Sequence, residues 1–143
     1  MLKSILTGVT MALTLTLAGN VFAADAAPQK RRVVLQVNDN DEKTWNHALA
    51  LAENMQVNAG GKDKIEVEIV AMSPGIRMVG DDSSARDRVS KAAENGILIR
   101  ACGYTMSAIR WGPEKLAPGV KVVPFGALEI VDKQIEGWAY IKP

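Results

Sequence analysis

The chain's single cysteine, Cys102, is the residue with the clearest chemical potential. It ends an apolar run that starts at Ile97, and Gly103 and a helical pattern follow it. Such a run predicts a buried strand that passes into a helix. A thiol at that junction lies beside unpaired backbone N–H groups and the positive end of the helix dipole, which lower a cysteine pKa and favour the thiolate. A free cysteine is also often a small buried hydrophobic residue, so a structural role stays open.

Because Cys102 is the only cysteine, the chain cannot close an internal disulfide. The residue is therefore buried and inert, paired to another chain, or kept as a working thiol. Without a second cysteine the thiol cannot resolve its own oxidation, but a persulfide or a mixed disulfide with a partner remains open.

The sequence lacks the residue patterns that other common kinds of active or binding site require. The chain has no glycine-rich phosphate loop after its first predicted strand, no Gly-x-Ser-x-Gly and no Cys-x-x-Cys. A Cys–His hydrolase would need His47, which lies off the apolar stripe of its predicted helix with nothing to orient it. The acidic cluster at 38–41 lacks the alternating ligands, central Gly and final Glu of a calcium loop. We therefore expect no metal and no cofactor.

The first 23 residues have the pattern of a secretory signal peptide. Lys3 provides a positive start, an apolar stretch covers 5–18, and Val21-Phe22-Ala23 fits a cleavage site. The stretch is short and rich in Thr for a membrane span, and no later segment approaches 18 apolar residues. We expect a periplasmic or secreted protein without membrane insertion after cleavage, with a flexible tether at 24–32 and one domain at 33–143.

Composition sets further limits. Removal of 23 of the 143 residues leaves 120, a length that suits one domain. It also removes one of the 17 basic residues, so the remaining 16 balance 16 acidic residues. A neutral chain with few aromatic residues gives no electrostatic argument for binding nucleic acid or an anionic membrane.

Predicted strands and helices alternate along the chain, and most of the strands are almost wholly apolar. This order predicts an α/β fold, a flavodoxin-like three-layer sandwich with a five-stranded, mostly parallel sheet and helices on both faces. The strands are expected at 33–37, 65–71, from Ile97, at 120–123 and at 138–141, and the helices at 42–58, after Asp81-Asp82-Ser83-Ser84, at about 105–111, and between Gly126 and Gly137.

Several details of this fold are predicted at the level of single residues. Glu66 and Glu68 alternate with apolar residues in the second strand, which suggests an exposed end, as on an edge strand. Asp39 and Glu42 resemble a capping box for the first helix. The residues expected to face inward are Trp45, Leu49, Ala52 and Met55 in the first helix and Leu128, Val131 and Ile135 in the last.

We expect the flavodoxin-like strand order 2-1-3-4-5, which makes the first and third strands neighbours where ligands bind beyond their carboxyl ends. Asn38 and Asp39 follow the first strand and would share this crevice with Cys102, with Pro124-Phe125-Gly126 on its far side. Pro74-Gly75 follows the second strand and marks either an ordinary turn or a rigid turn whose backbone approaches a ligand.

Four motifs together resemble the DsrE/DsrF-like family over nearly the whole mature chain. They are Ala101-Cys102-Gly103-x-Thr105-Met106, Ser73-Pro74-Gly75, Val123-Pro124-x-Gly126, and Gln134-x-x-Gly137-Trp138-Ala139-Tyr140-Ile141-Lys142-Pro143. The resemblance implies a small α/β domain, assembly as homotrimers or homohexamers, and a cysteine after the third strand that carries persulfide sulfur, the position of Cys102. Tyr104 stands where similar proteins often have Asn, and because the chain has an export signal, sulfur delivery to tRNA is not expected.

The expectation is thus an exported protein that binds or carries sulfane sulfur on Cys102, as a carrier more than as a turnover enzyme. Its partners would be a sulfur donor or acceptor protein or a small sulfur species, with one of the three tryptophans at a subunit interface. The alternative is a non-catalytic oligomeric binding module in which Cys102 is structural. The candidate binding residues are Gly103, Thr105, Asn38, Asp39, Pro74, Gly75 and Gly126.

Overall fold

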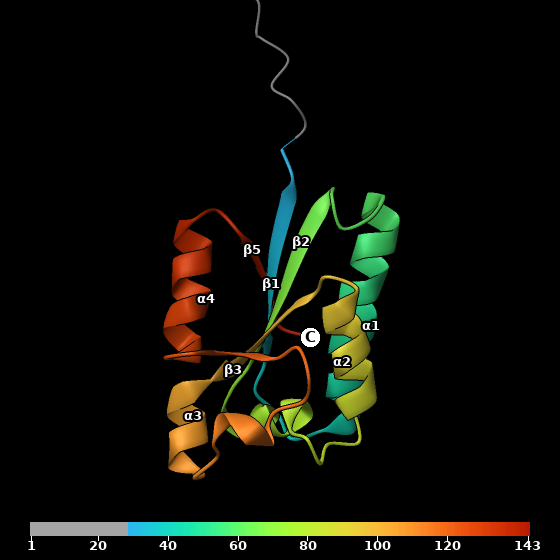
Figure 1. Ribbon diagram of the computed structural model, residues 1–143. Coiled ribbons are helices and arrows are strands. Elements are labelled where there is room, and N and C mark those ends of the chain that lie inside the picture. Colours follow the sequence, from blue (N-terminus) through green and yellow to red (C-terminus); the bar gives the residue numbers. More distant parts are fainter. Residues whose placement is uncertain (1–28) are drawn as a thin grey trace, which may run out of the picture.

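One parallel five-stranded sheet organises residues 29–143, the part of the chain that the computed structural model describes (Figure 1). No helix in this range is long and apolar enough to cross a membrane. In chain order the elements are β1 (Arg31–Val37), α1 (Glu42–Ala59), β2 (Ile65–Ala71), the 3-10 helix η1 (Ser73–Val79), α2 (Arg86–Glu94), β3 (Leu98–Cys102), α3 (Gly103–Ala108), the 3-10 helix η2 (Pro113–Lys115), β4 (Lys121–Val123), α4 (Gly126–Ile135) and β5 (Ala139–Ile141).

The predicted signal peptide at 1–23 and residues 24–28 of the predicted tether lie outside the described residues. β1 begins at Arg31, two residues before the predicted domain start, because Arg31 and Arg32 pair with Ile65 and Glu66 at the start of β2. Helices α1 and α2 cover one face of the sheet and α4 covers the other (Figure 1). The α/β flavodoxin-like fold with helices on both faces is thus confirmed.

The strand order is β4-β3-β2-β1-β5, so the predicted order 2-1-3-4-5 is wrong. The first three crossovers step away from β1 in one direction, and α4 then returns the chain to the far side of β1 as β5. Right-handed crossovers that run in opposite directions place their helices on opposite faces, which accounts for the position of α4. β3 therefore lies between β2 and β4, and the loops that follow those two strands are the neighbours of Cys102.

β2 is a central strand and not the predicted edge strand, because it pairs with β1 along its full length and with β3. Its Glu68 is fully buried. The Glu68 carboxylate lies 3.2 Å from Nε of Arg100 on β3 and 4.0 Å from Nζ of Lys133 on α4. Charge alternation in β2 thus marks a buried ion cluster, which these partners make possible.

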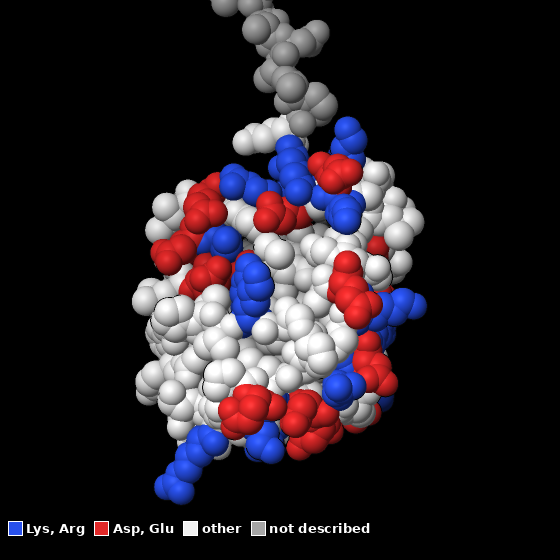
Figure 2. Space-filling model, viewed as in Figure 1, with Lys and Arg blue, Asp and Glu red and all other residues white. Residues whose placement is uncertain are grey.

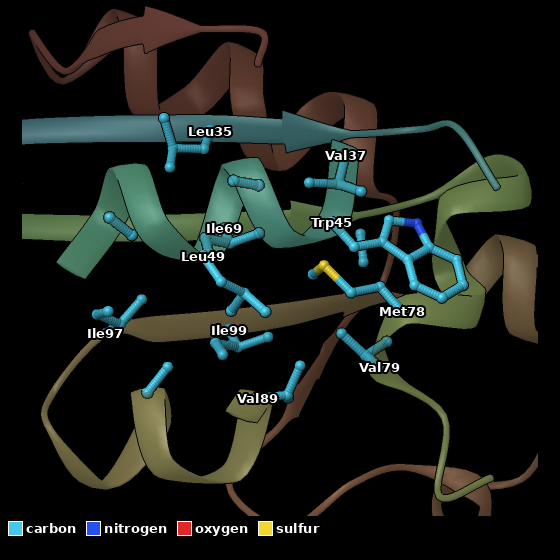
Figure 3. Close-up of a cluster of buried hydrophobic side chains, with 14 of the residues drawn as sticks. Leu35, Val37, Trp45, Leu49, Ile69, Met78, Val79, Val89, Ile97 and Ile99 are labelled. Atoms are coloured by element: carbon cyan, nitrogen blue, oxygen red, sulfur yellow. The ribbon is translucent and has the colours of Figure 1, made fainter. Parts of the chain in front are cut away.

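The main core lies between the sheet and helices α1 and α2 (Figure 3). Trp45, Leu49 and Ala52 are buried there as predicted, while Met55 is only partly buried. The N-cap of α1 is Asp41 and not the predicted Asp39, since the Asp41 carboxylate accepts the Thr44 N–H at 2.9 Å.

The core beneath α4 is smaller and consists of Val34, Val70, Ile130 and Trp138. The predicted inward residues of this helix point outward: Leu128 is 56%, Val131 46% and Ile135 80% exposed. α4 instead turns Ile130 and Lys133 to the sheet, because the Lys133 ammonium reaches both Glu68 and the ring of Trp138, 4.7 Å from its centroid. The helix therefore carries an apolar face that its own chain leaves uncovered.

Glu68 predicts a pH-dependent stability. Burial raises its pKa to about 7 from an ordinary 4.5, although Arg100 and Lys133 oppose the rise. Between these values the folded protein holds a proton that the unfolded chain has lost, so the contribution of Glu68 to stability is greatest below about pH 4.5 and is lost as pH rises through 7, by on the order of 3 kcal/mol. Glu68→Gln should flatten this slope in thermal unfolding measured from pH 4.5 to 8. Glu66→Gln, on the same strand, should keep the slope, and an unchanged slope in Glu68→Gln would contradict the prediction.

Candidate functional site

Cys102 ends β3 and directly precedes α3, as the sequence predicted. Its sulfur accepts a hydrogen bond from the Gly126 N–H, the first residue of α4, at 3.2 Å. A Cβ atom at position 126 would lie 3.1 Å from Cβ and 3.4 Å from Sγ of Cys102. Glycine at this position thus lets the helix begin directly against the thiol. The cysteine side chain is only 1% exposed.

The Thr105 hydroxyl is a second group that favours the ionised form of the thiol. Its hydroxyl oxygen accepts the Ser73 N–H at 3.1 Å, so the loop after β2 fixes the position of the hydroxyl. The single hydroxyl proton is then free to point toward the sulfur, and the Thr105 hydroxyl lowers the pKa of Cys102.

The pKa of Cys102 results from two opposing effects. Burial of the thiol raises its pKa because the charged thiolate is less well solvated. The Thr105 hydroxyl, the Gly126 N–H that bonds the sulfur, and the nearby backbone N–H groups of Thr105 and Tyr104 favour the thiolate and together outweigh the burial. The net pKa is lowered from the ordinary value, so the site favours the nucleophilic form.

A cavity of about 650 Å³ borders the cysteine. It lies at the carboxyl ends of the strands, between the loop after β2, helix α3 and the loop after β4. Tyr104 and Phe125 form its exposed rim, with ring centroids 5.3 Å apart in an edge-to-face pair. The lining residues are Asn40, Met72, Ser73, Pro74, Ile76, Arg77, Cys102, Tyr104, Thr105, Ala108, Ile109 and Phe125.

Of the predicted binding residues, Pro74 and Thr105 line this cavity with Cys102, and Gly126 contacts the sulfur. Gly75 lies behind the wall: a Cβ there would come within 2.5 Å of the Val37 carbonyl oxygen, so glycine lets η1 pack against the end of β1. A Cβ on Gly103 would lie 3.1 Å from the Val123 oxygen, which places Gly103 against β4.

Asn38 and Asp39 do not line the cavity, because β2 separates the end of β1 from Cys102. The Asn38 side-chain oxygen is buried with no hydrogen-bond partner among residues 29–143. The Asp39 carboxylate is 3.9 Å from the Lys142 ammonium. Asn40, two residues after Asn38, is the residue of this loop that reaches the cavity.

Sequence reasoning missed most of the residues that line the cavity, and nearly all of these follow β2 or belong to α3 and its end. Ligands of parallel sheets bind beyond the carboxyl ends of the strands, so the correct strand order would have pointed to the segment after β2. Within 29–143, no group of three His, Cys, Asp or Glu side chains is arranged to hold a metal ion. The missed residues are Asn40, Met72, Ser73, Ile76, Arg77, Tyr104, Ala108 and Ile109.

Comparison with solved structures relates this geometry to known proteins. The protein of unknown function MTH1491 from Methanobacterium thermoautotrophicum is 32% identical, with a TM-score of 0.75 and coverage of 80% of this chain and 100% of that one. The chain belongs to the family of MTH1491. No protein-family model and no curated protein matches it.

Two further structures are similar in fold alone. The conserved protein of unknown function BT1422 from Bacteroides thetaiotaomicron is 14% identical, with a TM-score of 0.65, over 78% of this chain and 94% of that one. The ychN protein from E. coli is 10% identical, with a TM-score of 0.64, over 80% and 100%. MTH1491 and YchN are DsrE-fold proteins, so the DsrE-like resemblance of the motifs is supported at the level of the fold.

Thr105 allows a direct test of the hydrogen bonds at the sulfur. Thr105→Val keeps the side-chain shape but removes the hydroxyl, so the pKa of Cys102 should rise and its alkylation by iodoacetamide near neutral pH should slow several-fold. The pH profile of the alkylation rate measures the shift, and Thr105→Ser should preserve the wild-type profile. A Thr105→Val profile identical to that of wild type would show that the hydroxyl does not stabilise the thiolate.

Proposed function

We propose that this protein carries sulfane sulfur on Cys102 as a persulfide. The observation that carries the proposal is the convergence of the Gly126 N–H and the Thr105 hydroxyl on a thiol at the wall of a large cavity. The resemblance of the cysteine motif to DsrE/DsrF-like proteins points to the same chemistry. Both stages of a carrier cycle, loading and unloading, depend on a stable thiolate.

In the loading step, the Cys102 thiolate attacks the outer sulfur of a donor persulfide. A sulfur–sulfur bond forms to Cys102, the sulfur–sulfur bond of the donor breaks, and the donor leaves as a thiolate. The transferred sulfur keeps its proton, and no external oxidant or reductant is needed. In the unloading step an acceptor thiolate removes the outer sulfur, and Cys102 leaves as the thiolate that its hydrogen bonds stabilise.

The competing function is a non-catalytic binding module in which Cys102 is structural. The 1% exposure of the side chain favours it, because a buried thiol can serve as a small apolar core residue. The two functions differ in access: a carrier thiol reacts in the native protein through the cavity, whereas a structural thiol reacts only after unfolding.

Mass spectrometry of the native protein tests this proposal. After treatment with an inorganic polysulfide or with an organic persulfide, the protein should gain the mass of one sulfur atom, and dithiothreitol should remove it. Cys102→Ser should gain none under the same conditions. A native protein that takes up no sulfur from either donor, and whose thiol is labelled only after unfolding, would support the structural role instead.

We also propose that the chain is exported, as a periplasmic or secreted protein. The proposal rests on the residue pattern at 1–23, which precedes the described residues. Export would separate the protein from cytosolic sulfur acceptors, so a donor or acceptor in the same compartment is required. Expression of the full chain in a bacterial host should yield a periplasmic protein that begins at Ala24, and retention of Met1 in the cytosol would contradict export.

Self-association as a trimer or hexamer is the quaternary structure we propose for this carrier. Support comes from the uncovered apolar face of α4, formed by Leu128, Val131 and Ile135. Figure 2 shows an uncharged stretch over α3 and the N-terminal part of α4. Trp45 and Trp138 are buried within the chain, which leaves the partly buried Trp111 as the candidate tryptophan, in addition to the exposed face of α4.

A charge on this face should break the assembly. Ile135→Asp removes an exposed apolar side chain and adds a carboxylate that an interface would desolvate, so sedimentation at micromolar concentration should shift from oligomer to monomer. Val57→Asp is the matched control, because Val57 is 76% exposed on α1, across the sheet. A monomeric wild type, or an Ile135→Asp variant that assembles normally, would count against self-association through α4.

A further inference from the structure

The cavity beside Cys102 has an uneven chemical character. Seven of its twelve lining residues are apolar or aromatic, and none is Asp, Glu or Lys. Among the described residues that line it, Arg77 in the last turn of η1 is the single charged side chain. A mostly apolar cavity with one charged group is typical of sites for small organic ligands, and about 650 Å³ lies within their usual range.

Arg77 is held in place but its charge is not neutralised. Its guanidinium lies over the ring of Trp111, 4.9 Å from the ring centroid. Within residues 29–143 it forms no ion pair, and none of its N–H groups donates a hydrogen bond. A neighbouring hollow that Arg77 also borders contains Glu42 and Asp82, but neither pairs with it, and Glu42 accepts the Ser84 hydroxyl instead.

The contact with the Trp111 ring leaves the guanidinium N–H groups without an acceptor among residues 29–143. An arginine stacked by its face still presents its N–H groups in the plane, where they fit the two oxygens of a carboxylate or sulfonate. The cavity is also much larger than thiosulfate requires, so a small inorganic donor would leave its apolar wall in contact with water.

We propose that this site binds an anionic organic persulfide as its sulfur donor, a proposal that rests on the proposed sulfur-carrier function. Its apolar body lies against Pro74, Ile76 and Ile109, and its acidic group pairs with Arg77. The outer sulfur of the donor passes to the Cys102 thiolate, the sulfur–sulfur bond of the donor breaks, and the organic part leaves as a thiolate that still carries its acidic group. Arg77 is thus a binding residue, and the organic body supplies the apolar contacts.

Methanethiosulfonate reagents test the anion selectivity of this cavity. They form a mixed disulfide with Cys102 and release methanesulfinate, so they report access and charge without any persulfide chemistry. At low salt the wild type should react with the 2-sulfonatoethyl reagent about tenfold faster, relative to free cysteine, than with the trimethylammonioethyl reagent. Arg77→Gln should abolish this preference and Arg77→Lys should keep part of it. Arg110→Gln, at an exposed arginine outside the cavity, should leave it unchanged.

Uncharged methanethiosulfonate reagents test whether the apolar wall of the cavity contributes to binding. Benzyl methanethiosulfonate should react faster than the methyl reagent after the same correction, and Ile109→Asn should reduce this difference while thermal unfolding confirms a folded variant. Equal rates for anionic and cationic reagents in the wild type, or a preference that survives Arg77→Gln, would overturn the proposal. Failure of sulfur loading with the Arg77-dependent preference intact would instead overturn the carrier function and leave the anion site standing.

Discussion

The contact between the end of β3 and the first turn of α4 is the constraint on which the other features of the site depend. The Gly126 N–H bonds the Cys102 sulfur, and the absence of a side chain at 126 brings the helix within van der Waals contact of Val70 and Cys102. This contact sets where α4 begins, and the same helix returns the chain across the sheet to β5. The contact between the Gly126 backbone and the Cys102 side chain thus serves two purposes. It provides the hydrogen bond to the thiol, and it fixes the start of the helix that leads to β5.

Most elements could be predicted from local patterns, because apolar runs, glycines and prolines determine where strands and helices begin and end. The bounds of β2 match the prediction, and Cys102 lies at the strand–helix junction as expected. The strand order could not be predicted, since right-handed crossovers allow both orders. That error moved Asn38 and Asp39 into the predicted site and left Arg77 out, because the neighbours of β3 were assigned to the wrong loops.

α4 shows a second limit of sequence patterns. Apolar periodicity predicts which residues are covered by something, but it does not say by what. Lys133 turns inward because Glu68 offers a buried counter-charge on β2, and the apolar stripe of the helix is then left outside. Likewise Glu68 seemed to mark an edge strand because its partners, Arg100 and Lys133, are 32 and 65 positions away in the sequence. Where long-range ion pairs of this kind form, charged residues can be buried while apolar residues beside them stay exposed.

Gly75 gives the cavity a fixed wall. Because η1 packs at 75 against the end of β1, and α4 packs at 126 against Cys102, the backbone on both sides of the thiol has no room to withdraw. The rim is different: the rings of Tyr104 and Phe125 pair edge to face, and both side chains are exposed to solvent. Tyr104 and Phe125 are therefore the part of the cavity lining that can change rotamer, on the picosecond to nanosecond timescale of exposed side chains, without movement of the main chain.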